Sequence, residues 1–79
     1  MRNRFYFHVE NPSPKLDPEG TELPSIKEAR SQAIALLGEM LQDADSGSLW
    51  DGAIWRVWVT DGPEGSGRIL VAVQVAAST

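Results

Sequence analysis

The stretch that decides the fold is SIKEARSQAIALLGEMLQDA, residues Ser25 to Ala44. At about 100° per residue, its apolar side chains fall within a stripe roughly 140° wide, as in an amphipathic helix. Ser25 and Glu28 have the spacing of a capping box, in which each side chain caps a backbone amide of the other residue. We therefore predict a helix that begins after Ser25 and ends near Ala44 or Asp45, with Gly47 as its stop signal. The apolar stripe consists of Ile26, Ala29, Ala33, Leu36, Leu37, Met40, Leu41 and Ala44.

Three stretches with the alternation of β-strands surround this helix: Arg4 to Val9, Ile54 to Thr60 and Arg68 to Ala76. The proline-rich segment Asn11 to Pro24 predicts a loop, and the glycine-rich segment Asp61 to Gly67 predicts a hairpin turn. The order β-α-β-β predicts an α+β fold, a three-stranded antiparallel sheet with one amphipathic helix packed on one face. The first strand should lie beside the second or the third. Residues 1–79 are expected to form a single domain.

The predicted sheet has two unlike faces. One face is uniformly apolar and should pack against the helix, and it consists of Phe5, Phe7, Val9, Trp55, Val57, Val59, Ile69, Val71, Val73 and Val75. The other mixes aromatic, basic and apolar side chains, a composition typical of protein interfaces. A homo-oligomer, most simply a dimer, could bury it. Alternatively, the 11–24 loop or the C-terminal tail covers it, or it binds a ligand or nucleic acid. The candidate interface residues are Arg4, Tyr6, His8, Ile54, Arg56, Trp58, Leu70 and Gln74.

Composition argues against several classes of function. The net charge is -4 and the basic residues are scattered, so we expect no nucleic-acid partner. The chain has no cysteine and no apolar run long enough for a signal peptide or a membrane helix. We therefore expect a soluble, cytoplasmic protein without a membrane partner.

The sequence also offers few groups for catalysis. We interpret His8 as a partly exposed strand histidine with a structural hydrogen bond, because no nucleophile or carboxylate is placed to form a triad with it. The acidic residues Asp17, Glu19 and Glu22 lack the spacing of a calcium loop, so turn formation explains them better. The 62–67 segment lacks the Lys-Ser/Thr pair of a phosphate loop. We expect no enzyme activity, no catalytic residue, no cofactor and no metal.

Three motifs together resemble a known family. They are Arg-Phe-Tyr-Phe-His-Val at residues 4–9, Asp-Pro-Glu-Gly-Thr-Glu-Leu-Pro at 17–24 and Glu-Ala-Arg-Ser-Gln-Ala at 28–33. The chain resembles the DUF6894-like family of small bacterial proteins over nearly its whole length. It departs from the family pattern in extra prolines after Asn11 and in its Gly/Pro-rich hairpin. The resemblance implies a bacterial cytoplasmic protein and supplies no activity; the positions that match are His8, Asp17, Glu19, Gly20 and Arg30.

These observations lead to a ranked set of hypotheses. The leading one is a non-enzymatic interaction domain that homo-oligomerises through the sheet face opposite the helix. The second is a module that binds a different protein, by a loose analogy of size and fold with HicB-like antitoxins. The third is a small-ligand or metal site near His8 and the acidic loop of residues 17–22.

Overall fold

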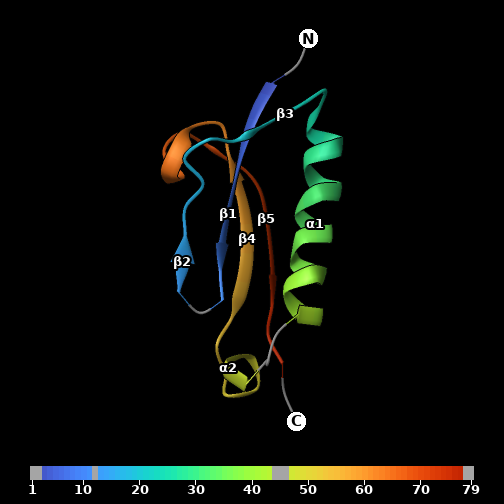
Figure 1. Cartoon of the computed structure of the whole chain (residues 1–79), viewed down its shortest axis with the longest axis vertical. Coiled ribbons are helices and arrows are strands. Elements are labelled where there is room, and N and C mark those ends of the chain that lie inside the picture. The colour runs from blue at the N-terminus through green and yellow to red at the C-terminus, as the bar shows by residue number, and fades with distance from the viewer. Residues whose placement is uncertain (1–2, 12, 44–46, 78–79) are drawn as a thin grey trace.

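The computed structural model describes residues 3–11, 13–43 and 47–77. It confirms the α+β class, with one long helix on an antiparallel sheet (Figure 1). The predicted helix end at Ala44 or Asp45 lies outside the described residues. In chain order the elements are β1 (Asn3–Glu10), β2 (Pro14–Lys15), β3 (Thr21–Leu23), α1 (Ile26–Asp43), α2 (Gly47–Trp50), β4 (Trp55–Thr60), the 3₁₀ turn η1 (Pro63–Gly65) and β5 (Ile69–Val75).

The sheet has five strands in the described part of the chain, so the prediction of three was wrong. The strand order is β2-β1-β4-β5, and β3 also pairs with β1. The first strand of the chain thus lies beside the second long one, which was one of the two predicted positions. Both additional strands come from the segment predicted to be a loop. Each pairs with only two or three residues of β1, which is too short to produce a readable alternation.

The two short strands leave a gap along the outer edge of β1. β3 pairs with residues Asn3 to Phe5, and β2 pairs with Val9 and Glu10. Residues 16–20, which connect the two short strands, therefore pass the middle of β1 without a ladder partner. This gap is where the polar groups described below come together.

The middle of the predicted apolar stripe packs on the sheet, but its members Ile26 and Leu41 are exposed, so their assignment to the core was wrong. Ser25 precedes it and donates from its hydroxyl to the Glu28 carboxylate, the two residues of the predicted capping box. α1 lies over β4 and β5. The buried core consists of Phe5, Leu23, Ala29, Ala33, Val57 and Val59. On the opposite side of the sheet lie η1 and the segment that follows β2 (Figure 1). Both faces of the sheet are thus at least partly covered.

One irregularity in β5 changes the predicted assignment of two side chains. Val59 pairs with Val71, but Thr60 pairs with Ile69, so Leu70 is the extra residue of a β-bulge. Ile69, predicted to be in the core, is 64% exposed. Leu70, predicted to face away from the helix, packs against the core. Both predictions were wrong because a single extra residue shifts the alternation of all residues before it.

Candidate functional site

The polar centre of the molecule is His8 in the middle of β1. Its side chain is 0% exposed, so the prediction of a partly exposed histidine was wrong, while the predicted structural hydrogen bond is confirmed. The backbone N–H of Asp17 donates to His8 Nδ1 at 3.0 Å, and His8 Nε2 lies 2.8 Å from Thr60 Oγ1. Thr60 in turn donates its hydroxyl proton to the carbonyl of Gly62 at 2.7 Å.

This chain of hydrogen bonds fixes the state of the imidazole. Because Nδ1 accepts from a backbone amide, the proton of the neutral ring sits on Nε2 and is donated to Thr60. A protonated ring would instead direct a hydrogen from Nδ1 at the Asp17 N–H. Burial lowers the pKa of His8, and the nearby Asp17 carboxylate offsets this only in part. His8 is therefore a neutral structural group whose two ring nitrogens are both engaged.

The Asp17 carboxylate fills the gap on the outer edge of β1. Its Oδ2 accepts the Phe7 N–H at 3.1 Å, and its Oδ1 accepts the N–H groups of Glu19 and Gly20, each at 3.0 Å. Burial on its own would raise the pKa of Asp17, but the hydrogen bonds from these three amides lower it below its usual value. A side chain thus replaces the missing strand at Phe7, and Asp17 holds the loop over His8 from both its backbone and its carboxylate.

Two further contacts secure the same loop. The Arg4 guanidinium donates to the Glu19 carbonyl at 2.8 Å and pairs with Glu22 at 3.2 Å. The Glu64 N–H of η1 donates to the Asp17 carbonyl at 2.9 Å. Gly20 sits at φ +76°, and a Cβ there would lie 2.8 Å from an Arg4 carbon. The acidic loop is therefore held in place over β1. Cover by the 11–24 loop was one of the alternatives in the sequence analysis.

Trp58 lies next to His8 on the same face of the sheet. The two ring centroids are 5.3 Å apart, and Trp58 is 9% exposed. The Arg56 guanidinium carbon lies 4.4 Å from the centroid of the Trp58 ring, and Arg56 Nε donates to Glu10 at 2.7 Å. Arg56 thus covers the indole through a cation–π contact within the chain.

The structure divides the predicted interface residues into two groups. In the first group, the chain's own loop and side chains cover His8 of β1 and its neighbour Trp58 of β4, and Arg4 is bound to the loop. In the second group, Ile54, Arg56 and Gln74 remain exposed. Tyr6 is half-buried, and Leu70 belongs to the core side. The assignment of these residues to an interface stays a prediction, but only the second group forms an open surface.

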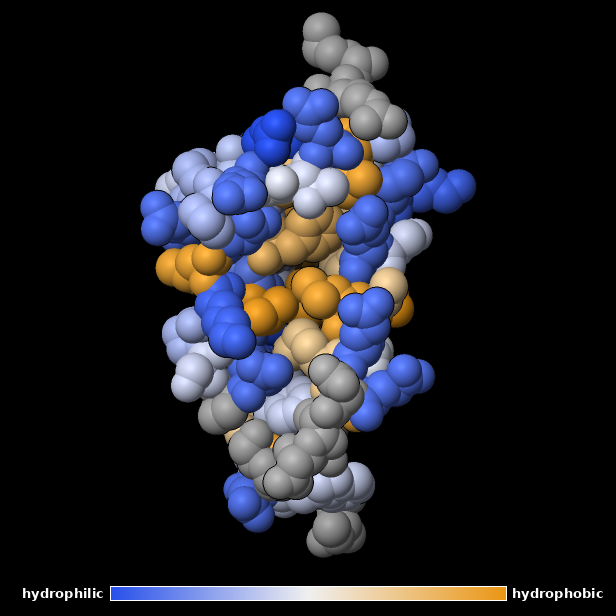
Figure 2. Space-filling view, viewed as in Figure 1, coloured by the Kyte–Doolittle hydropathy of each residue, from blue (hydrophilic) through white to orange (hydrophobic). Residues whose placement is uncertain are grey.

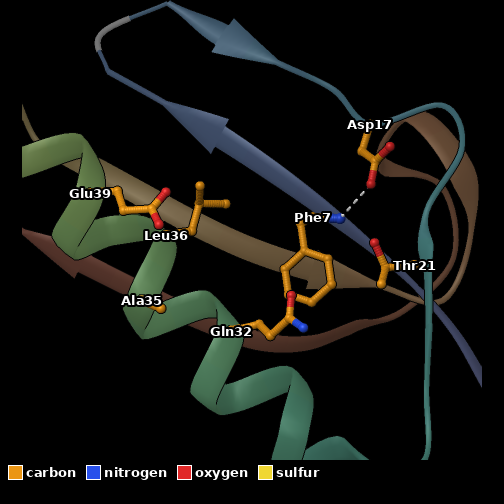
Figure 3. Close-up of a pocket in the computed structure, with 7 residues that line it drawn as sticks. All are labelled: Phe7, Asp17, Thr21, Gln32, Ala35, Leu36 and Glu39. Atoms are coloured by element: carbon orange, nitrogen blue, oxygen red, sulfur yellow. Dashed lines mark hydrogen bonds between the residues drawn. The ribbon is translucent and has the colours of Figure 1, made fainter. Parts of the chain in front are cut away.

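Two hollows lie at the edges of α1. The hollow in Figure 3 encloses about 290 Å³ between α1 and β1, and it is lined by Phe7, Asp17, Thr21, Gln32, Ala35, Leu36 and Glu39. Figure 2 shows that apolar surface gathers in this furrow and that hydrophilic residues flank it. A second hollow of about 650 Å³ lies near the start of α1 and includes Phe5, Ile26, Leu70 and Asp61.

The described residues contain no group of three His, Asp or Glu side chains placed to hold a metal ion. In the same part of the chain, no buried side-chain nitrogen or oxygen lacks a hydrogen-bond partner. No helix of the described structure has the length and apolarity needed to span a membrane. The polar groups singled out in the sequence, His8 and the acidic loop of residues 17–22, are instead engaged in hydrogen bonds and ion pairs within the chain.

The feature that sequence reasoning missed is the outer edge of β5. Among the described residues, β5 pairs only with β4, so its other side has no strand partner. Its sequence, ILVAVQV, contains no charged residue and no proline. The opposite side of the sheet ends in strands of two and three residues, with Pro14 in one and the ion-paired Glu22 in the other. The absence of charge in residues 69–75 could have indicated this open edge from the sequence, because edge strands normally carry protective charges or prolines.

Comparison with known proteins adds a family but no activity. No curated protein and no solved structure matches the chain. A family model described as a domain of unknown function (DUF6894) matches residues 4–76. This range holds β1 except its first residue, the His8–Asp17 network, α1 and all of β5. The chain therefore belongs to the DUF6894 family.

Proposed function

We propose that this domain is a non-enzymatic protein-interaction module that contacts its partner through the β5 side of the sheet. The observation that carries the proposal is the contrast between the two edges. One edge ends in short strands with proline and ion-paired glutamate, and the other is a seven-residue uncharged strand that has no strand on its outer side within the described residues. An edge of this kind is a template for the addition of a further strand.

The register shows which backbone groups are available there. The Phe7 N–H points to Asp17, away from β4, so the Phe7–Val59 pair is not hydrogen-bonded. Bonded and non-bonded pairs alternate in an antiparallel ladder. Val59 therefore bonds toward Val71 of β5, and the N–H and C=O groups of Ala72 and Gln74 point to the open edge.

The surface next to this edge supports the same role. Ala72 and Gln74 are exposed on the face opposite α1, and so are Arg56 and Ile54 close by. These residues are what remains open of the face on which self-association was predicted. The part of this face around His8 and Trp58 contributes no surface, because the chain itself buries both side chains. The proposed interaction surface is thus the β5 edge together with the exposed residues beside it, Ile54, Arg56, Ala72 and Gln74.

The polar network is the main argument against an enzyme. His8, Asp17 and Thr60 would be the natural candidates for acid–base chemistry, but their hydrogen-bonding groups already hold the loop in place. A small-ligand or metal site at this loop would have to displace those bonds. The network therefore supports a role in which the loop side is structural and the β5 side is functional.

Photo-crosslinking in the native cells tests the proposal. A photoreactive amino acid at position Gln74, on the open edge, should give a specific adduct with a protein. The same amino acid at Glu19, an exposed position on the loop side, is the matched control and should give none. No adduct at position 74, or equal adducts at both positions, would contradict the proposal. An adduct with a different protein would favour the antitoxin-like alternative over self-association.

A further inference from the structure

We propose that the occupant of the β5 edge is a second copy of this chain, paired antiparallel through β5 and packed through α1. This inference rests on the proposed function and names its partner. A two-fold axis perpendicular to the sheet would join the two β5 strands into one continuous sheet of both copies. The same axis places both α1 helices on one face of that sheet, side by side and antiparallel.

The spacing of the elements fits this arrangement. α1 lies over β4 and β5 together, so its axis runs between those strands. Neighbouring strands are about 4.8 Å apart, so the two helices would stand two strand spacings, or about 9.6 Å, from each other. Helices that pack directly lie about 8–10 Å apart. Pairing at β5 therefore brings the helices to contact distance without any change within the protomer.

The flank of α1 that would face the second copy carries two exposed apolar side chains, Ile34 and Leu41, beside Leu37, which packs partly against the core. At about 100° per residue, Ile34, Leu37 and Leu41 lie within about 60° of one another, on the flank opposite the residues that line the hollow beside β1. Ile34 is 62% exposed and Leu41 is 37% exposed. Ile34 also lies near the middle of α1, where two crossing helices meet.

Charge favours a second copy at this place. Two chains of net charge -4 repel each other over most of their surface. All seven residues of β5 are uncharged, and the flank of α1 with Ile34, Leu37 and Leu41 adds the exposed, basic Arg30, so this strip carries none of the acidic residues that cause the repulsion. The strip formed by β5 and this flank of α1 is about 27 Å long and about 20 Å across the sheet and helix layers. It would bury about 500 Å² per copy, whereas a standard interface buries about 800 Å² per partner. We therefore expect a dimer with a dissociation constant in the micromolar range.

Sedimentation of the purified chain over a micromolar concentration series tests the inference. The wild type should shift with concentration from 8.6 kDa toward twice that mass. Ile34→Lys should remain monomeric, because it places two charges in the apolar contact between the helices. Leu16→Lys is the matched control, an exposed apolar residue on the loop side, and should dimerise like the wild type. Circular dichroism should show that both variants are folded.

Amide hydrogen exchange then locates the contact. Exchange at Ala72 and Gln74 should slow several-fold as the concentration rises, whereas Val71 and Val73, already bonded to β4, should not change. A monomer at every concentration, a dimer that survives Ile34→Lys, or a dimer with unchanged exchange at Ala72 and Gln74 would each overturn the inference. If the purified chain is monomeric but position 74 crosslinks to another protein in cells, the proposed function stands and the second copy does not.

Discussion

Replacing Asp17 with alanine tests whether one carboxylate holds the loop over the sheet. The change removes the acceptor of three backbone hydrogen bonds, from Phe7, Glu19 and Gly20. It leaves the backbone N–H that donates to His8. Glu19→Ala is the matched control, because it removes the same charge from the same loop while the contact of Arg4 is with the Glu19 backbone carbonyl.

The magnitude follows from the burial of the amides. The Phe7 N–H is part-buried in the gap between β3 and β2, and an unpaired buried amide costs about 1–3 kcal/mol. The two turn bonds contribute about 1 kcal/mol together, because water can replace them in part. We therefore expect Asp17→Ala to lower the free energy of unfolding by about 2–4 kcal/mol. For a domain of this size, that lowers the Tm by roughly 10–30 °C.

Thermal and urea unfolding of both variants measure the effect. Glu19→Ala should stay within about 0.5 kcal/mol of the wild type. The pKa of Asp17 is lowered in the folded chain, so its contribution is present above its ordinary value of 3.8 and is lost as the pH falls below that value. The Asp17→Ala variant should not show this loss of stability at acid pH. Equal stability of the two alanine variants at neutral pH would refute the reasoning.

Three other predictions follow from the same contacts. Folding lowers the pKa of His8, so the stability of the wild type should fall as the pH drops below 6.5. Urea titrations should show a flatter dependence of stability on pH for His8→Gln. A flat profile for the wild type would contradict a buried, neutral His8 ring. Gly20→Ala should cost about 1–3 kcal/mol in thermal unfolding, because the φ is +76° and a Cβ would lie 2.8 to 3.0 Å from atoms of β1; wild-type stability would contradict it. Leu70→Ala should lower the free energy of unfolding by at least about 1 kcal/mol more than Ile69→Ala, because Leu70 packs against the core and Ile69 is exposed. The reverse order would contradict the β-bulge at Leu70.

Periodicity predicted the long elements well. The apolar stripe of α1 and the alternation in β1, β4 and β5 each extend over six residues or more, and local sequence is enough to detect them. The strands β2 and β3 could not be found in this way. They exist because the outer edge of β1 offers free backbone groups, which is a property of the assembled sheet and not of residues 14–23.

The candidate site shows the same limit. His8 and Asp17 were both singled out by the sequence, but nothing local says that the Asp17 backbone reaches His8 while its carboxylate reaches Phe7. Those contacts depend on how the loop returns over β1. The bulge at Leu70 is a similar case, because one extra residue in a ladder leaves no mark in an all-apolar strand.

The most direct test of the interaction surface is an isotope-filtered nuclear Overhauser experiment on an equal mixture of labelled and unlabelled chain. We predict intermolecular contacts between the β5 strands of two copies, and between the Ile34 methyl groups and the helix of the second copy. Intermolecular contacts confined to the loop of residues 13–20, or none at a concentration where the chain is dimeric, would contradict the account.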